Sequence, residues 1–340
     1  MGSLAALDKP FPGGNFSVSV LAVAGYQSGV LIRNHLSELS ALGLPLHLAL
    51  GVFDGVHVGH QAVIAQAVAA AKSGGLAGVL TFHPHPACLV GSQLPPAALL
   101  ASLDHKARII ARLGIGLFVP LHFDAAFARM EATEFLDQLL AAPIRTIAVG
   151  EDWRFGCGRR GDVAMLRERC ANSGIALAAV PMVMVDGERV SSTRIRQAIR
   201  DGSLAAAAKM LGRPYALSGV IVEGRKLARQ LGFPTANVAI GAVLTPPDGV
   251  WAVRAAVAGR EALPGIANLG VRPTVDGESR VLEVHLFDFS GDLYGQEIEV
   301  EFVHFQRPEI RFSSLDLLRL QIEADVEQAR QVLAVSTGVR

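Results

Sequence analysis

The sequence predicts two domains of different class: an α/β domain with a mostly parallel sheet, then an all-β domain with a terminal helix. Three observations predict this. The chain has 340 residues, a length that favours two domains. Short apolar runs alternate with helix-forming segments until about residue 211. Beyond that point, β-type runs are separated by turns rich in Gly, Pro and Asp.

The composition is that of a globular protein without net charge. Apolar residues make up 51% and charged residues 18% of the chain, and the formal net charge is zero. This balance argues against general nucleic-acid binding. The apolar stretch 16–32 contains too many polar residues to span a membrane. Three cysteines without a C-x-x-C pair, and no evident secretory signal, predict a cytoplasmic protein with reduced thiols.

The α/β domain begins with a strand and a helix that set the pattern for the rest. Leu46–Leu50 is an apolar run typical of a buried strand, and Gln61–Ser73 is Ala-rich and free of Gly and Pro, as in a helix. The pattern then repeats, with strands expected at 76–82, 117–121, 146–150 and 176–185 and helices at 103–113, 133–142 and 163–173. Such alternation predicts right-handed crossovers between parallel strands.

Polar and unusual segments follow the predicted strand ends. They are His57 to His60, His83 to Pro86, Gly150 to Gly156, and Ser191 to Arg196, the last of which opens a helix. Ligands of parallel sheets bind beyond the carboxyl ends of the strands. We therefore expect these segments to meet at one edge of the sheet and to line a site.

The most informative segment is Gly55-Val56-His57-Val58-Gly59-His60. It places two histidines at the N-terminus of a predicted helix, where free backbone N–H groups and the helix dipole attract phosphate. Imidazoles held there can add charge to a phosphate that becomes more negative in a transition state. This is the H-x-G-H arrangement of nucleotidyltransferases, which favours a Rossmann-like domain that splits ATP between its α and β phosphates. The alternative is two ordinary loop histidines.

Two further segments of this domain allow more than one interpretation. Ser191 to Arg196 offers hydroxyls and two arginines to a triphosphate or pyrophosphate, but it could be an ordinary capped helix. His83 to Pro86, together with His57 and His60, could suggest zinc. Because no carboxylate or thiolate is closely paired with them, we favour a loop shaped for substrate or phosphate.

The all-β domain is expected to be a small barrel with a helix packed on it. β-type runs cover 250–257, 282–289 and 298–305, and Ser313 or Ser314 can cap the final helix. One apolar face of that helix should pack on the barrel. Its members are Leu315, Leu318, Ile322, Val326, Ala329 and Leu333.

Two features of the all-β domain point to phosphate chemistry. A basic, glycine-bearing loop at 219–231 can fold over a nucleotide, and Thr235 and Asn237 offer neutral oxygens to Mg²⁺. Glu283, on a strand and facing the barrel interior or mouth, could serve as a general base. The alternatives are a β-turn with a conventional Asn and a solvent-facing Glu on an edge strand.

The ordered set of motifs resembles the bacterial bifunctional riboflavin kinase/FAD synthetase (FMN adenylyltransferase) family over about residues 48–330. The motifs are Gly51 to His60, Thr81 to Pro86, Gly150 to Gly156, Ser191 to Arg196, Gly232 to Asn237, Ala267 to Thr274, Leu282 to His285 and Arg307 to Phe312. The resemblance implies that the C-terminal domain phosphorylates riboflavin with ATP to give FMN. The N-terminal domain would then transfer AMP from a second ATP to FMN, giving FAD and pyrophosphate.

The resemblance also implies roles for residues of the adenylyltransferase. His57 and His60 would be catalytic. ATP would be bound by Phe53, Asp54, Gly55, Gly59, Ser192, Thr193, Arg194 and Arg196. FMN would be bound by His83, Pro84, His85, Asp152, Arg154 and Phe155.

In the kinase, the resemblance implies that Glu283 takes the proton from the ribityl 5′-hydroxyl and that Mg²⁺ lies at Thr235 and Asn237. ATP would be bound by Gly224, Lys226, Arg229, Gly232, Pro234, Thr235 and Asn237. The flavin would be bound by Arg307 and Phe312. The domains implied are an extension at 1–45 of unassigned role, the adenylyltransferase at 46–200, a linker at 201–213 and the kinase at 214–335.

Three departures from the family pattern bear on rival interpretations. Val52 stands where the family usually has Asn, Trp153 where it has Phe, and Ala228 where it commonly has Gly. One rival is a monofunctional FMN adenylyltransferase with a decayed kinase domain, and another is a non-catalytic flavin- or nucleotide-binding regulator. The intact Thr235, Asn237 and Glu283 argue against the first rival, although Ala228 weakly favours it. The presence of His57, His60 and Glu283 argues against the second. The sequence leaves a weak homo-oligomer open.

Overall fold

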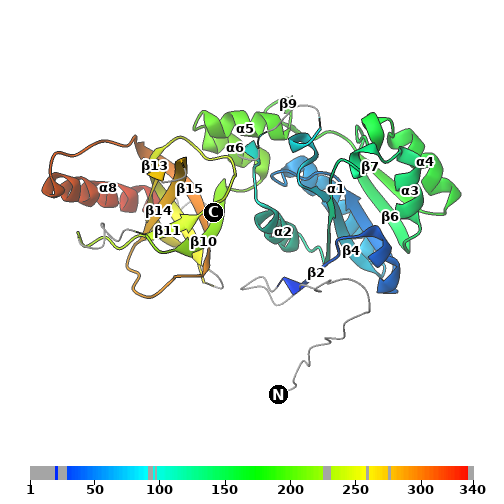
Figure 1. The fold of residues 1–340 in the computed structure, drawn as a ribbon, viewed down its shortest axis with the longest axis horizontal. Coiled ribbons are helices and arrows are strands. Elements are labelled where there is room, and N and C mark those ends of the chain that lie inside the picture. The colour runs from blue at the N-terminus through cyan, green and yellow to red at the C-terminus, as the bar shows by residue number, and fades with distance from the viewer. Residues whose placement is uncertain are drawn as a thin grey trace, which may run out of the picture.

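The structure is a computed structural model that describes residues 20–21, 29–90, 95, 98–224, 231–257, 260–274 and 277–335. It confirms the predicted architecture, an α/β domain followed by a β-barrel with a terminal helix (Figure 1). The expectations for Lys226, Ala228 and Arg229 fall outside the described residues, as do those for most of the segment that precedes β2.

The α/β domain is built on a seven-stranded sheet in the order β1-β2-β5-β4-β3-β6-β7. All neighbouring strands are parallel except β1, which pairs antiparallel with β2. The strands are β1 (Val20–Leu21), β2 (Val30–Ile32), β3 (Leu46–Leu50), β4 (Leu76–His83), β5 (Leu117–His122), β6 (Ile144–Gly150) and β7 (Ala176–Val180). Part of the segment 1–45 thus contributes two strands to the sheet.

The strand predicted over 176–185 is shorter in the structure. β7 ends at Val180, and a separate hairpin of β8 (Met184–Val185) and β9 (Glu188–Arg189) follows. Its turn residues Asp186 and Gly187 both have positive φ, at 54° and 80°. Asp-Gly favours such a two-residue turn, because Gly and Asp tolerate the left-handed conformation.

Helices cover both faces of the sheet. The helices α1 (Val58–Ala71) and α2 (Leu103–Arg112) pack on one face, and α3 (Ala132–Leu140) and α4 (Val163–Asn172) on the other. Side chains cap three of them: His57 accepts from the N–H of His60, Ser102 from that of His105, and Asp162 from that of Met165. Short 3₁₀ turns lie at Leu36–Glu38, Ser40–Leu42, Pro86–Cys88, Phe127–Arg129 and Cys157–Arg159.

The C-terminal barrel is closed in the order β10-β11-β14-β13-β12-β15. Its strands are β10 (Ala216–Val222), β11 (Ala236–Ala239), β12 (Gly249–Val257), β13 (Leu263–Thr274), β14 (Gly277–Leu286) and β15 (Glu297–Arg307). The sequence analysis did not predict β10, β11 or β13, and residues 219–222, expected in the basic loop, belong to β10. β13 contains two prolines and two glycines, residues that are depleted in strands and obscure the pattern.

The terminal helix α8 (Leu315–Val335) packs on the outer face of the barrel through Val326, Ala329 and Leu333. Ser314 caps it by accepting from the N–H of Leu317 at 3.2 Å. The expected apolar face is wrong at its beginning, because Leu315 is 56% exposed. The first turns of the helix lie beyond the cluster of apolar side chains that covers the barrel at Ala329 and Leu333.

Two helices join the domains. α5 (Ser192–Arg200) precedes α6 (Leu204–Leu211), which occupies most of the segment 201–213 that was expected to be a linker (Figure 1). The buried side chains of both helices belong to the same apolar core as Trp251 and the other inward-facing residues of the barrel. The connecting helices are therefore packed into the core of the barrel, and the segment between the domains is not a flexible linker. Among the described helices, none is long and apolar enough to cross a membrane.

Candidate functional site

A strained loop carries the two histidines from β3 into α1. Phe53, Gly55 and Val56 all have positive φ, at 51°, 76° and 44°. A β-branched residue such as Val rarely adopts this conformation, and strain of this kind concentrates at functional sites. A side chain at position 55 would also clash with its neighbours, because a Cβ there would lie 2.6 Å from Cδ1 of Leu100. The loop thus aims His57 at a fixed point beyond the carboxyl end of β3.

The rings of His57 and His60 are stacked, with centroids 3.5 Å apart and planes 17° apart. Gly59 allows this arrangement, since a Cβ there would lie 3.1 Å from Cε1 of His57. Burial lowers the pKa of His57 to about 4, and the charge of Arg189 adds to the shift. Burial also lowers the pKa of His60 well below its usual value, as does the charge of His57. Both imidazoles are therefore neutral near pH 7, whereas the sequence analysis expected them to add charge.

A pocket of about 450 Å³ opens beside this pair. It is lined by Val52, Asp54, His60, His85, Ala87, Ser192, Thr193, Arg196, Gln197 and Arg200. Three of the four polar segments that the sequence placed at strand ends thus meet at one cavity. Among the predicted ATP ligands, Phe53 and Gly55 are buried beneath it. His83 is exposed at the end of β4, and Pro84 follows it.

Asp54 and Arg196 form a buried ion pair in the wall of this pocket, with 2.5 Å between Oδ2 and Nη2. Asp54 also accepts from the N–H of Leu100 at 3.0 Å, and Nε of Arg196 donates to the carbonyl of Ala98 at 2.8 Å. The carboxylate thus offsets the charge of Arg196. Arg194 points elsewhere, because it donates to the carbonyls of the β8–β9 hairpin at Glu188 and Arg189.

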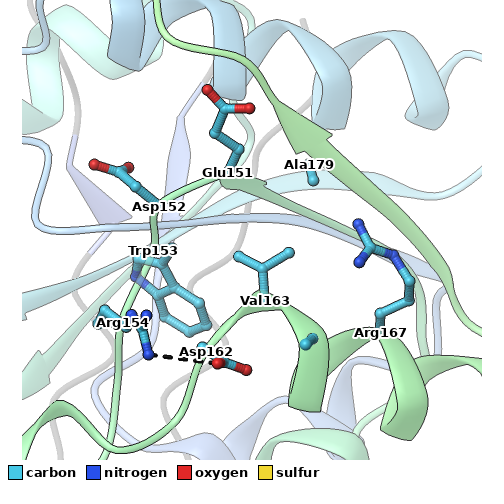
Figure 2. A pocket seen from close by; sticks show the side chains of 9 residues that line it. Glu151, Asp152, Trp153, Arg154, Asp162, Val163, Arg167 and Ala179 are labelled. Atoms are coloured by element: carbon cyan, nitrogen blue, oxygen red, sulfur yellow. Dashed lines mark hydrogen bonds and ion pairs between the residues drawn. The ribbon is translucent and has the colours of Figure 1, made fainter.

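The segment after β6 lines a second pocket of about 490 Å³ (Figure 2). Asp152 and Arg154 lie on its rim and are paired with Arg189 and Asp162, respectively. In Figure 2 the Trp153 ring and the Arg167 guanidinium flank Val163 from opposite sides. Phe155 is buried in the core and stacks under Trp153, with ring centroids 4.6 Å apart. The aromatic face open to this pocket is therefore that of Trp153.

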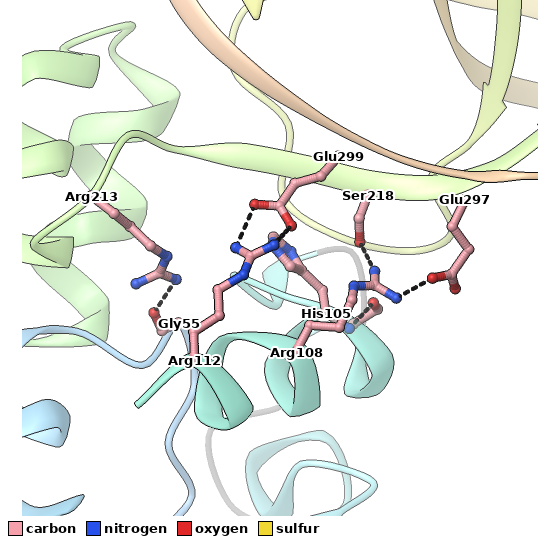
Figure 3. Close-up of polar contacts among 9 residues, drawn as sticks. Gly55, His105, Arg108, Arg112, Arg213, Ser218, Glu297 and Glu299 are labelled. Carbon is pink, nitrogen blue, oxygen red and sulfur yellow. Dashed lines mark hydrogen bonds and ion pairs between the residues drawn. The ribbon is translucent and has the colours of Figure 1, made fainter. Parts of the chain in front are cut away.

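Arg213, which follows α6, holds the strained loop from the other side (Figure 3). Its guanidinium donates to the carbonyl of Gly55 at 2.7 Å and to that of Val56 at 3.1 Å. Gln61 donates to the carbonyls of Val56 and Leu211, at 2.9 and 2.7 Å. The backbone that presents His57 therefore depends on the segment that leads into the barrel.

Charged contacts connect α2 to the barrel nearby (Figure 3). Arg108 pairs with Glu297 at 2.7 Å and donates to Ser218 at 2.9 Å, and Arg112 forms a bidentate pair with Glu299 at 2.8 and 2.9 Å. Burial alone would raise the pKa of Glu299, but the hydrogen bonds from Arg112 and the nearby His105, 3.7 Å away, hold it below its usual value. The face of α2 toward the barrel is thus polar.

In the barrel, Glu283 stands on the outer face. Its neighbours Leu282 and Val284 are buried inside, so the alternation of β14 turns Glu283 outward, not into the interior. Nor is β14 an edge strand, because Glu283 lies opposite Asn237 of β11 on one side and Asn268 of β13 on the other. Asn237 is 9% exposed. Gly224 leaves room for it, since a Cβ at Gly224 would lie 2.1 Å from Nδ2 of Asn237.

A third pocket of about 610 Å³ opens at the end of the barrel next to Pro234 and Thr235. The loop 289–294 and the apolar side chains of Val284 and Leu286 complete it. Such a mainly apolar hollow with a few polar groups is the usual form of a heterocycle site. Gly232, at a φ of 92°, precedes it.

Arg307 is occupied by the terminal helix. Its guanidinium makes contacts of 2.6 and 3.0 Å with the carboxylate of Asp325, which is buried on α8. It also lies 5.9 Å from the ring centroid of Phe312. These contacts bring the two predicted flavin residues together and fix α8 to the end of β15.

Three cations near the pocket beside His60 were not found from the sequence. Arg189 pairs with Asp152 from the β8–β9 hairpin, and Arg213 binds backbone carbonyls, and the sequence gives no signal for either contact. Lys106 could have been found, because it stands on a predicted helix at a position that faces the core. Its Nζ donates to the carbonyl of Val52 at 2.9 Å.

Comparison with known proteins assigns both halves of the chain. A family model for FAD synthetase matches residues 44–194, and one for riboflavin kinase matches residues 211–333. The bifunctional riboflavin kinase/FMN adenylyltransferase of Escherichia coli K12 is 40% identical over 292 residues, which cover 85% of this chain and 93% of that protein. The chain belongs to this bifunctional family.

Other relatives agree with this assignment. The Bacillus subtilis bifunctional riboflavin kinase/FMN adenylyltransferase is 35% identical over 288 residues, covering 83% of this chain and 90% of its own. A solved Streptococcus pneumoniae structure, described as a macrolide-efflux protein, is 30% identical with a TM-score of 0.75. It covers 88% of this chain, which in turn covers 98% of it. The resemblance inferred from the motifs is confirmed.

Proposed function

We propose that the pocket beside His57 and His60 transfers AMP from ATP to FMN, and that the outer barrel face around Glu283 phosphorylates riboflavin. As a member of its family, the chain is an enzyme with both activities. It converts riboflavin and ATP to FMN, and FMN with a second ATP to FAD and pyrophosphate. The observation that carries the assignment of the first site is the stacked histidine pair at the N-terminus of α1.

In adenylyl transfer, a phosphate oxygen of FMN attacks the α-phosphorus of ATP and pyrophosphate leaves. The N-terminus of α1 offers free N–H groups to the phosphates. The neutral imidazoles of His57 and His60 donate hydrogen bonds as charge develops on the α-phosphate. Ser192 and Thr193, at the start of α5 across the pocket, offer hydroxyls to the leaving pyrophosphate. Asp152, Arg154 and Trp153 in the neighbouring pocket are proposed to receive the flavin.

In the kinase reaction, Glu283 is proposed to take the proton from the ribityl 5′-hydroxyl as it attacks the γ-phosphorus. Mg²⁺ keeps few protein ligands and takes the rest from phosphates and water. The neutral oxygens of Thr235 and Asn237, one strand away from Glu283, suit this requirement. Bound there, Mg²⁺ would neutralise charge on the ATP phosphates. Lys226 and Arg229 remain proposed ATP ligands from the sequence.

The direct test is incubation of the purified protein with riboflavin, ATP and Mg²⁺, followed by chromatography of the flavins. We expect FMN to appear first and FAD to follow. FAD formation from supplied FMN without any FMN formation from riboflavin would identify a decayed kinase domain. Absence of both products, with flavin or nucleotide still bound, would identify a regulator. We propose the cytoplasm as the compartment, in keeping with the free thiols of Cys88, Cys157 and Cys170.

Residues 214–340 expressed alone should make FMN but not FAD, because the proposed kinase residues belong to a barrel that closes on itself. The apolar side chains of α6 are part of that barrel's core. A fragment that begins at Ser203 should therefore unfold at a higher temperature than one that begins at Pro214. Thermal unfolding and flavin chromatography on both fragments test this. A folded fragment that makes no FMN would contradict the proposal that the kinase domain begins near residue 214 and works alone.

Arg213→Met should slow FAD formation by about 10- to 100-fold. The loop that presents His57 would lose its hydrogen bonds from the guanidinium, and small displacements of catalytic groups lower the rate strongly. Arg112→Met is the matched control, since Arg112 lies at the same joint and pairs with Glu299 of the barrel. Rates of both half-reactions should be measured for each variant. Equal slowing of FAD formation in both variants would mean that the joint matters as a whole and Arg213 has no particular role.

A further inference from the structure

The adenylyltransferase pocket has little positive charge close to its histidines, since Arg200, one of the two arginines in its lining, is exposed. The two imidazoles beside it are neutral near pH 7. The guanidinium of Arg196 is offset by Asp54 in a buried pair. A pentacovalent phosphate gains negative charge as it forms, and preorganised cations around it lower the barrier. A further buried cation close to the histidines would supply part of this charge.

Lys106 is placed to supply it. The residue is 6% exposed and stands in the first turns of α2, one position along from His105, which faces the barrel. The barrel-facing side of α2 also carries Arg108 and Arg112, as Figure 3 shows, whereas Lys106 lies on the side with Ile110, which is buried against the sheet. Lysine is almost never fully buried unless it is paired. A lysine on the core side of a helix therefore needs a reason.

The surroundings of Lys106 all belong to the proposed site. Its Nζ donates to the carbonyl of Val52, which lines the pocket, and no second acceptor is found within the described part of the chain. Its charge acts on His60 and on His83 and His85, while Asp54 acts on it. A lysine that served packing alone would not need to direct an ammonium at the backbone of the catalytic loop.

We propose that Lys106 is a positioning residue for adenylyl transfer. Its buried ammonium fixes the carbonyl of Val52 at the start of the strained loop. It also supplies the positive potential behind the pocket in which the phosphates of ATP are held. The proposal rests on the assignment of this pocket to adenylyl transfer.

A dependence on pH follows. Burial lowers the pKa of Lys106 to about 8, partly offset by Asp54. The ammonium is charged below that pH, so the rate of FAD formation should fall as the pH rises through about 8. Stability should change in the opposite sense. Because the unfolded chain keeps this proton up to the ordinary lysine pKa, the contribution of Lys106 to stability increases with pH above about 8. Loss of FAD formation there is therefore not a loss of fold.

The alkaline limb can be assigned to Lys106 only if the groups around it do not titrate in the same pH range. These groups are Asp54 and Val52 on the loop, His60 on α1, and His83 and His85 at and after the end of β4. Asp104, on the same helix as Lys106, affects the pKa of His83 through its charge. The pKa values of the three histidines are all lowered by burial. These three imidazoles are therefore neutral at pH 8, so an alkaline limb there reports on Lys106.

The experiment compares Lys106→Met, Lys106→Arg and the control Lys72→Met, an exposed lysine at the far end of α1. FAD formation from FMN and ATP, and FMN formation from riboflavin, are measured between pH 6 and about 9.5, a range set by the lysine pKa. We expect Lys106→Met to lower kcat for FAD by about 10- to 100-fold and to abolish the alkaline limb. Lys106→Arg should recover part of the rate with no alkaline limb, and Lys72→Met should behave as the parent.

Each outcome decides the proposal. A folded Lys106→Met protein with unchanged kcat for FAD and an intact alkaline limb would overturn it. If that variant does not fold, the profile of the parent enzyme still decides, because a flat rate through pH 8 contradicts the proposal. If His57→Ala with His60→Ala abolishes FAD formation while Lys106→Met does not change it, the inference about Lys106 fails alone. If neither change has an effect, the site itself is wrongly assigned.

Discussion

Replacing His57 and His60 together with Ala should abolish FAD formation and leave riboflavin phosphorylation nearly intact. The two neutral rings stack at the N-terminus of α1, and His60 lines the pocket that also contains Ser192. Removing one transition-state donor costs roughly 2.7–4 kcal/mol, so removal of two should take the rate below detection. The kinase reaction should continue because Glu283 belongs to the barrel.

His57 also caps α1, so the design must separate capping from chemistry. His57→Asn keeps a side-chain acceptor at the cap position, since Asn is among the best N-cap residues, but it removes the imidazole. We expect His57→Asn to unfold at nearly the parent's temperature and still to make little FAD. Full FAD synthesis by the double Ala variant would remove this pair from the mechanism, whereas recovery by His57→Asn would reduce His57 to a cap.

Glu283→Gln should lower kcat for FMN formation by roughly 10²- to 10⁴-fold, which is the usual contribution of a general base. The change removes the proton acceptor but keeps the size of the side chain between Asn237 and Asn268. FAD formation from supplied FMN should barely change, because its site lies in the other domain.

Both half-reactions and thermal unfolding should be measured on this variant and on Glu327→Gln, a similar change at an exposed position of α8. A structural Glu would leave kcat within about twofold and change the free energy of unfolding by under about 0.5 kcal/mol, as surface substitutions do. An unchanged kinase kcat would exclude Glu283 as the base.

The fold could be predicted from the sequence because each strand and helix of the α/β domain carries its own local pattern. Leu46–Leu50 and the Ala-rich segment after it show this clearly, and the order of elements then limits the topology. β13 was not predicted because Pro264 and Gly265 interrupt the apolar alternation typical of a strand. Pairing with β12 and β14 stabilises it on both sides. Its stability is a property of the barrel and not of the segment.

The position of the site could be predicted, but its internal connections could not. Strand ends identified the edge of the sheet where His60, His85 and Ser192 meet. The pair of Asp54 with Arg196 joins residues 142 positions apart, and a single sequence carries no record of such a contact. Leu282 and Val284 are apolar, so the alternation of side chains along the strand indicates that Glu283 faces the other way. This places Glu283 on the outer face only once the strand is known to belong to a closed barrel.

The hydrogen bonds from Arg213 to the loop at Gly55 and Val56 affect the order in which the protein folds during synthesis. Synthesis runs from the N-terminus, and domains fold as they leave the ribosome. The sheet and its helices emerge well before Arg213, so the nascent domain has its histidines but lacks the guanidinium that secures their loop. The proposed site of FAD formation is therefore completed only when translation has passed Arg213, and a chain that stops earlier would lack this contact.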